Sequence, residues 1–294
     1  MSFTPVAIPL AVLFGFLVGV VVNLIADYLP AQRHYHLART SPFASRSAVP
    51  RKPTFFPRRA DSENNEHLWP VPLWSGVIAA LADAHIYEPH QRTRHIVIEI
   101  GMALAFGWIV WTFAETPSWP FLLFYAAVLI LIAIIDVEYR WVFSEIVVLA
   151  GLVALFEAAY SPRVRLDEAI SGGVHGLLVM LALYLLGIVF ARLIALFTGR
   201  RVGRTVLGFG DVYIGALGGL ILGWNGLWFA LFIMILTGAV ASLGFMSIKI
   251  IKTGRYRVFS AIPYGPYIVI GIAAMLYIPQ IVDLVLRRVM NWPF

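Results

Sequence analysis

Long apolar runs recur along almost the whole chain, and they constrain its fold more than any other feature of the sequence. A helix needs about 20 apolar residues to cross the ~30 Å hydrocarbon core of a bilayer. Of the 294 residues, 60% are hydrophobic and only 13% are charged, and the mean hydropathy is +0.83. Soluble globular domains are not this apolar. The sequence therefore predicts an all-α fold, a polytopic helical bundle integral to a membrane.

About eight segments are long and apolar enough to be transmembrane helices. The sixth is short and glycine-rich, and only Trp224-Asn225-Gly226 separates it from the seventh, so we expect those two to form a tight hairpin. The first lacks the basic start and the cleavage site of a signal peptide, so we expect it to be retained. The expected spans cover residues 5–27, 95–114, 119–136, 142–160, 168–197, 207–223, 225–249 and 262–286.

Residues 31–94 differ from the rest of the chain, because they are rich in Arg, His, Pro and Ser. Four prolines in the first half of this segment disfavour a long helix, so we expect a polar loop, with a short surface helix between Leu73 and Tyr87. We therefore expect three parts: a first transmembrane span (1–30), a basic loop (31–94) and a membrane core (95–294).

The distribution of basic residues predicts how the chain crosses the membrane. If the 31–94 loop is cytoplasmic, seventeen Lys and Arg residues lie on the cytoplasmic side and four on the other side. This bias satisfies the positive-inside rule. We therefore expect a multi-pass protein with a cytoplasmic first loop and both termini outside.

Two aspartates at the ends of apolar segments are the strongest functional signal. Asp136 follows the apolar run that ends in Ile134-Ile135, and Asp211 closes the sequence Gly208-Phe209-Gly210-Asp211. Acidic residues are costly in lipid, so they usually face a protein interior or water. With the predicted topology both acids lie at the cytoplasmic ends of their helices. We therefore expect the two carboxylates to converge at one depth.

Two converging carboxyl groups can activate water. Because they cannot both ionise easily, they share a proton. One can then accept a proton from water, while the other donates to the carbonyl oxygen or the leaving amine of a peptide. Gly208 and Gly210 lack side chains, so a substrate backbone can approach them. Taken alone, however, Asp136 beside Arg140 also fits an ordinary surface ion pair, and Gly-x-Gly also fits simple helix packing.

Five segments of the chain, in this order, together resemble one known family. They are Phe14-Gly15-Phe16-Leu17-Val18-Gly19 with Asn23 and Leu29-Pro30, Arg94-His95 to Glu99, Asp136, Gly208-Phe209-Gly210-Asp211 with Ala216-Leu217-Gly218, and Ile262-Pro263-Tyr264-Gly265-Pro266-Tyr267. They are similar to motifs of the type IV prepilin leader peptidases, membrane aspartic proteases of the GxGD type. The resemblance covers most of the chain outside residues 31–90.

This resemblance implies an aspartic endopeptidase of the bacterial inner membrane, with Asp136 and Asp211 as its catalytic residues. Its substrates would be type IV prepilins or the pseudopilins of type II secretion, cut after a Gly at the cytoplasmic face, between a basic leader and an apolar segment. Membrane lipid surrounds such a protein, and we expect no nucleic-acid partner. The residues expected to contact the substrate are Gly208, Gly210, Pro263 and Gly265.

Many members of the family also N-methylate the new N-terminus with S-adenosylmethionine, and this cofactor is needed only if that activity is retained. Glu99, inside the second span, is then a candidate for binding the methyl donor or for lining a water-filled cleft, although packing against a polar partner is the more ordinary explanation. The family's long loop often holds zinc in two Cys-x-x-Cys pairs, but this chain has no cysteine. A thiol nucleophile and a cysteine zinc site are therefore excluded, and we expect no metal.

Two other classes of function remain open at this point. Carboxylates within a membrane also carry protons or cations in transporters, although the sequence shows no clear inverted repeat. A non-catalytic membrane scaffold derived from the peptidase, with the 31–94 loop as its docking surface, is the second alternative.

Overall fold

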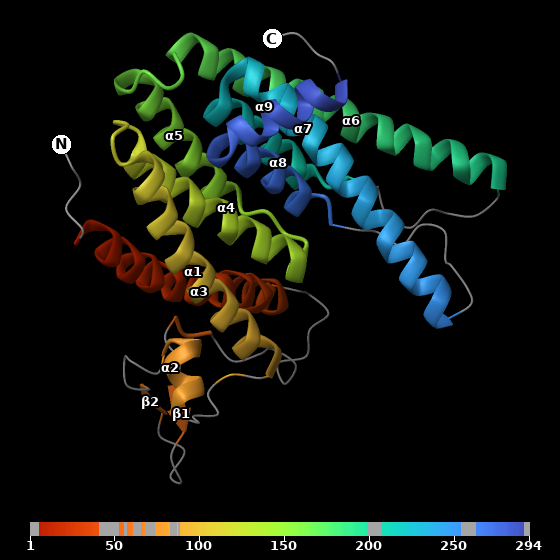
Figure 1. The fold of residues 1–294 in the computed structure, drawn as a ribbon. Coiled ribbons are helices and arrows are strands. Elements are labelled where there is room, and N and C mark those ends of the chain that lie inside the picture. Colours follow the sequence, from red (N-terminus) through yellow and green to blue (C-terminus); the bar gives the residue numbers. More distant parts are fainter. Residues whose placement is uncertain are drawn as a thin grey trace. The chain divides into compact units, whose positions relative to one another are not determined.

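The computed structural model describes residues 6–40, 53–55, 58–60, 66–68, 74–82, 87, 89–198, 207–253 and 263–290 (Figure 1). The chain divides into two compact units, Met1–Leu131 and Ile132–Phe294, and each is described by itself. Among the described residues, one short pair of strands accompanies the helices. The predicted helical membrane fold is confirmed, and this small strand pair is an addition to it.

Two long helices, α1 (Ala7–Thr40) and α3 (Pro89–Phe113), pack against each other in the first unit. Glycines on α1 let the two backbones approach closely. A Cβ atom added at Gly15 would lie 2.6 Å from the Cβ of Phe106, and one added at Gly19 would lie 2.8 Å from the Cα of Glu99. Small residues serve the same purpose in many membrane helix pairs.

Regular structure occupies part of the predicted 31–94 loop. Helix α1 continues through Pro30 to Thr40, because proline removes only one hydrogen bond and the residues after it are mostly good helix formers. Further along, β1 (Arg58–Ala60) pairs antiparallel with β2 (Glu66–Leu68). The short helix α2 (Gly76–Leu81) follows and packs on α3.

The second unit consists mainly of helices packed around α7. Helix α4 (Trp119–Tyr139) crosses the boundary between the units in sequence. The helices that follow are α5 (Ser144–Tyr160), α6 (Leu166–Thr198), α7 (Phe209–Thr253), α8 (Gly265–Tyr277) and α9 (Pro279–Met290).

Helices α6 and α7 meet through matching glycine pairs. Gly172 and Gly176 on α6 lie against Gly219 and Gly215 on α7, so each helix presents glycines four residues apart to the other. A Cβ added at Gly172 would lie 2.6 Å from the carbonyl carbon of Gly223, and one at Gly176 would lie 2.9 Å from that of Gly215. This close glycine contact is a common interface in membranes, and it fixes the first half of α7, whose first turn contains Asp211.

Helix α7 contains a break at Gly223, whose φ of 70° and ψ of −179° are not helical. A residue with a side chain rarely adopts this φ, so glycine is suited to the position. The break lies just before the predicted connection at residues 224–226. The predicted spans 207–223 and 225–249 therefore correspond to the two parts of α7.

Five of the described helices are long and apolar enough to cross a bilayer: α1, α3, α4, α6 and α7. The number is six if α8 and α9, bent by 101° relative to each other, form one broken span. The sequence suggested eight, because it counted the two parts of α7 separately and because it counted the 17-residue helix α5. The result is a multi-pass membrane protein.

Candidate active site

Asp136 lies near the carboxyl end of α4 and is only 6% exposed. The first residue of α8, Gly265, donates a backbone hydrogen bond to its carboxylate. The two residues are so close that a Cβ added at Gly265 would lie 2.8 Å from the Cγ of Asp136. Within the described part of the chain, Oδ2 of Asp136 accepts no hydrogen bond. The fold therefore leaves one buried oxygen of this carboxylate unsatisfied.

Asp211 lies in the first turn of α7 and is 5% exposed. Its Oδ2 accepts a 2.8 Å hydrogen bond from the backbone N–H of Gly208, and its own N–H donates to the Gly208 carbonyl over 3.1 Å. These two hydrogen bonds close the turn that begins the helix. They also fix the orientation of the carboxylate.

The two acids occupy equivalent electrostatic positions, because each carboxylate lies at the N-terminus of a helix. Asp136 faces the start of α8, and Asp211 belongs to the first turn of α7. The N-terminus of a helix carries a partial positive charge, which stabilises an anion nearby. The charge of Asp136 also acts on the Asp211 carboxylate. The structure therefore brings together two acids that are 75 positions apart in the sequence.

The two glycines of the Gly208-Phe209-Gly210-Asp211 motif have different roles in the fold. Gly208 supplies the N–H that binds Asp211, and a Cβ added to it would meet nothing closer than 3.6 Å. Gly210 instead packs against Val142, whose Cγ2 would lie 2.6 Å from an added Cβ. Gly210 therefore lets the segment after α4 approach the start of α7. Contacts of either glycine with a substrate stay predictions.

Sequence reasoning did not identify Val142 or the direct contact between Gly265 and Asp136. Val142 is an ordinary apolar residue after a helix, and nothing in its type or spacing marks it. For Gly265 a signal existed, because a glycine beside a proline at the start of a helix permits close approach. Pro263 is half-buried two residues before Gly265, and its contact with a substrate also stays a prediction.

Arg140 directly follows the last residue of α4 and lies one helical turn after Asp136. Its backbone N–H donates to the Asp136 carbonyl over 2.9 Å, and its φ is 55°. A residue other than glycine rarely adopts this φ outside tight turns. The charge of Arg140 also acts on the Asp136 carboxylate. Arg140 is exposed, so this interaction is screened by solvent.

Glu99, the candidate for binding a methyl donor, is fully buried in the first unit and holds α2 on α3. Its carboxylate accepts hydrogen bonds from the Ser75 hydroxyl (2.6 Å), the Gly76 N–H (2.8 Å) and the Val77 N–H (3.1 Å). Ser75 in turn caps α2 by accepting from Ile78 N–H. Both carboxylate oxygens of Glu99 thus accept hydrogen bonds from the start of α2, as expected if Glu99 packs against a polar partner. Binding of a methyl donor by Glu99 stays a prediction.

Metal ligands do not gather in the part of the chain that the structure describes. No three His, Asp or Glu side chains there lie close enough together to hold an ion. Of the five histidines between residues 31 and 94, the side chain of His67 and the whole of His85 lie outside the described residues.

The chain is similar to known leader peptidases. Residues 123–243, which include Asp136 and Asp211, match the model of the type IV leader peptidase family. The chain is 24% identical over 282 residues to the prepilin leader peptidase/N-methyltransferase of Pseudomonas aeruginosa, covering 92% of this chain and 90% of that protein. It is 24% identical over 280 residues to the protein of the same name from Stutzerimonas stutzeri, covering 92% and 91%. No solved structure matches the chain. The similarities do not favour a transporter or a scaffold.

Proposed function

From the match of residues 123–243 to the type IV leader peptidase family model, we propose that the chain is a membrane aspartic endopeptidase that removes the leader peptide of type IV prepilins or pseudopilins. The cut is made at the cytoplasmic face of the bacterial inner membrane. Asp136 and Asp211 are its catalytic residues. Gly208, Gly210, Pro263 and Gly265 contact the substrate.

The observation that carries this proposal is the pairing of two buried aspartates in one unit of the chain. Asp136 and Asp211 are each at least nine-tenths buried, and the charge of Asp136 acts on Asp211. Two buried carboxylates of which one acts on the other cost free energy when both are ionised, because neither neutralises the charge of the other. Such groups concentrate at sites of acid and base chemistry.

The proposed chemistry needs only these two side chains and a water molecule. One proton shared by the pair leaves one carboxylate ionised and the other protonated. The ionised carboxylate takes a proton from water as the water oxygen attacks the scissile carbonyl carbon, and the protonated one donates to the carbonyl oxygen. Collapse of the tetrahedral intermediate then breaks the C–N bond, and a carboxyl group protonates the leaving amine.

The direct test is to co-express a prepilin with variants in which either aspartate becomes asparagine. Asp136→Asn and Asp211→Asn keep the side-chain volume but remove the titratable group, so each should abolish leader cleavage, measured by the mobility and mass of the prepilin. Asp167→Asn is the matched control, because Asp167 is exposed and paired with Arg165 on the surface. Full cleavage by either Asp136→Asn or Asp211→Asn, at normal protein levels, contradicts the proposal.

A second activity, N-methylation of the new N-terminus with S-adenosylmethionine, is proposed from the names of the two relatives. The mass of the mature substrate decides it, since one methyl group adds about 14 Da. A processed N-terminus without this increase, in cells that supply the methyl donor, contradicts methylation and leaves the peptidase proposal intact.

The orientation can be tested directly, because the chain contains no cysteine and single cysteines can be labelled without background. We propose that the segment after α1 is cytoplasmic and the connection between α5 and α6 is outside. In spheroplasts, a membrane-impermeant maleimide should then label Arg165→Cys but not Arg39→Cys, and both after lysis. Both positions are exposed. The reverse pattern contradicts the proposed topology.

A further inference from the structure

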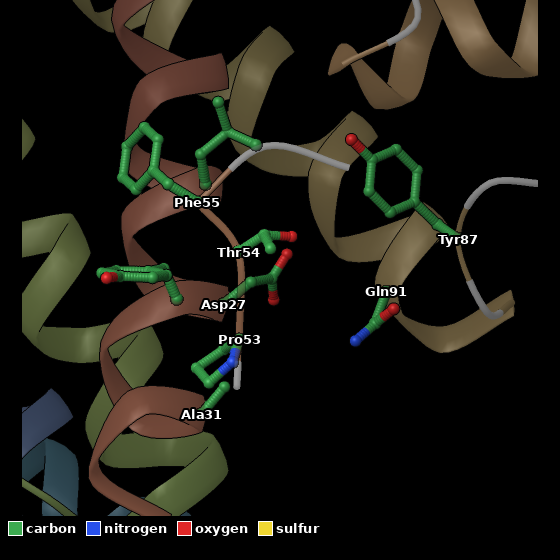
Figure 2. A pocket seen from close by; sticks show the side chains of 9 residues that line it. Asp27, Ala31, Pro53, Thr54, Phe55, Tyr87 and Gln91 are labelled. Atoms are coloured by element: carbon green, nitrogen blue, oxygen red, sulfur yellow. The ribbon is translucent and has the colours of Figure 1, made fainter. Parts of the chain in front are cut away.

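The first unit contains a cavity of about 210 Å³ that the proposed peptidase chemistry does not use. Its lining includes Asp27 of α1 and Gln91 of α3. It also includes Thr54 and Tyr87, which lie in the segment between these two helices. Figure 2 shows the Asp27 carboxylate and the Thr54 hydroxyl on one side of a space, with the Gln91 amide and the Tyr87 ring on the opposite side. Three different segments of the chain therefore contribute polar groups to one cavity.

Asp27 is the charged residue among those that line this cavity. Its carboxylate is held from the other side by the Arg94 guanidinium and by His95, whose Nε2 lies 2.8 Å from Oδ2. His95 is itself fully buried, while 26% of the Asp27 side chain stays exposed. The carboxylate is thus fixed in position but still accessible from the cavity, and none of the described residues that line this space is a lysine or arginine.

Two carboxylates and one guanidinium act on the Tyr87 side of the cavity. Glu99, also buried, adds a second carboxylate to the group formed by Asp27 and Arg94. The pKa of the Tyr87 phenol reflects these charges. Burial raises this pKa, and the negative charges of Asp27 and Glu99 raise it further, whereas the positive charge of Arg94 lowers it by a smaller amount. A positive group entering the cavity beside Tyr87 would therefore be stabilised.

The size of the cavity limits what it can hold. Pockets for drug-sized ligands and cofactors have volumes of about 300–1,000 Å³, so a cavity of about 210 Å³ suits a group the size of one side chain. From its shape and lining we infer that the cavity binds one small organic cation, an ammonium or guanidinium group. Both groups are hydrogen-bond donors, and they complement a carboxylate, a hydroxyl and an amide carbonyl as acceptors.

Two sources can supply this cation: a lysine or arginine side chain carried on a peptide, or a free amine. This site is independent of the proposed cleavage chemistry, because neither Asp136 nor Asp211 lines it. Binding of a cation to it can also be measured without any cleavage. Failure of cation binding therefore leaves the peptidase proposal standing, and failure of cleavage leaves this inference standing.

The experiment uses the full chain in lipid nanodiscs and calorimetric titration with three probes: Nα-acetyl-lysine amide, n-butylamine and Nα-acetyl-norleucine amide. Norleucine has the chain of lysine without its ammonium, so we expect it to bind at least about tenfold more weakly, a difference of about 1.4 kcal/mol. Lysine amide binding more tightly than butylamine identifies a peptide as the source, and equal affinity identifies a free amine. Norleucine amide binding as well as lysine amide overturns the inference.

Gln91 allows a charge test that should not disturb the fold, because none of the described hydrogen bonds involves its side chain. Gln91→Lys places a positive charge in the cavity and should weaken lysine amide binding at least about tenfold, whereas Gln91→Glu should strengthen it about threefold or more. Gln280→Lys and Gln280→Glu are matched controls at an exposed site on α9 and should change the affinity less than about twofold. Unchanged affinity in Gln91→Lys overturns the inference.

Discussion

Gly265, the first residue of α8, lies directly against the carboxylate of Asp136 near the end of α4. Its backbone N–H donates to that carboxylate. At this distance no side chain fits between the helix N-terminus and the acid, so the partial positive charge of α8 acts on Asp136 at close range. Asp211 has the same relationship to the start of its own helix. Backbone dipoles therefore stabilise both acids.

Replacement of Gly265 by alanine should damage the site while leaving both aspartates in the sequence. The new methyl group would overlap Oδ2 of Asp136 and lie 2.8 Å from its Cγ, so the carboxylate or α8 must move. We expect leader cleavage to fall about 100-fold, since a misplacement of 1 Å can cost that much. Overpacking should also lower the free energy of unfolding by about 1–3 kcal/mol. Cleavage rates and thermal unfolding in detergent measure the two effects.

The control for this variant is Gly187→Ala on α6, where an added Cβ meets no atom within 4 Å. It should keep full cleavage and gain slightly in stability, because alanine favours the helix over glycine by about 0.5–1 kcal/mol. If Gly265→Ala cleaves as fast as Gly187→Ala, the contact between Gly265 and Asp136 does not position the carboxylate.

Gly210 and Val142 should behave as a coupled pair. In Gly210→Ala the new Cβ would lie 2.6 Å from Val142 Cγ2 and 2.7 Å from its Cβ, so we expect reduced stability and cleavage. Val142→Gly removes both of these atoms. The double variant should therefore lose less than the two single variants added together, by about 0.5–3 kcal/mol of coupling in a double-mutant cycle. Strict additivity would show that the two residues do not press on each other.

Much of the fold could be predicted from the sequence because a bilayer requires long apolar helices. The helix starts and ends were less predictable. The first span was expected to end at residue 30, but α1 continues through Pro30 for ten more residues, because one lost hydrogen bond did not outweigh good helix formers. At Gly223 the expected break is present, since a φ of 70° needs glycine.

The candidate site was predictable only in part, and for a physical reason. Acids at the ends of apolar segments stand out, so Asp136 and Asp211 could be singled out from their positions in the sequence. The neighbours of these acids depend on the register in which α8 and the segment after α4 pack; the glycine beside a proline at the start of α8 indicated a close approach there, but no local pattern identified its partner. The motif also made Gly208 and Gly210 look equivalent, although one binds Asp211 and the other contacts Val142. Their catalytic and substrate-binding roles stay predictions.

The glycine contact between α6 and α7 should be among the most sensitive positions of the second unit. In Gly219→Ala the new methyl group would overlap the backbone of Gly172 and lie 2.8 Å from Gly173 N. Backbone atoms cannot rotate away, so the helices must separate, and we expect a loss of about 1–3 kcal/mol or more in the free energy of unfolding.

The same substitution at Gly244, also on α7, provides the comparison. An added Cβ there meets nothing within 4 Å, so Gly244→Ala should be neutral or slightly stabilising. Both variants gain the same helix propensity, so the difference between their melting temperatures in one detergent measures the effect of packing on stability. Equal melting temperatures would mean that the glycine contact contributes nothing to stability.

The last prediction separates two roles of Glu99, the anchoring of α2 and the binding of a methyl donor. Glu99→Gln keeps the shape of the side chain but loses the charge that strengthens its bonds to Ser75, Gly76 and Val77. A hydrogen bond to a charged group contributes about 1.5–3 kcal/mol, so amide hydrogen exchange in α2 should accelerate about tenfold or more. Ser75→Ala removes one of the same bonds without touching the carboxylate. If Glu99 only anchors α2, the two variants should lose methyl transfer in proportion to the exchange rates of α2. A direct contact with the methyl donor predicts that Glu99→Gln loses much more methyl transfer than Ser75→Ala does at a comparable exchange rate.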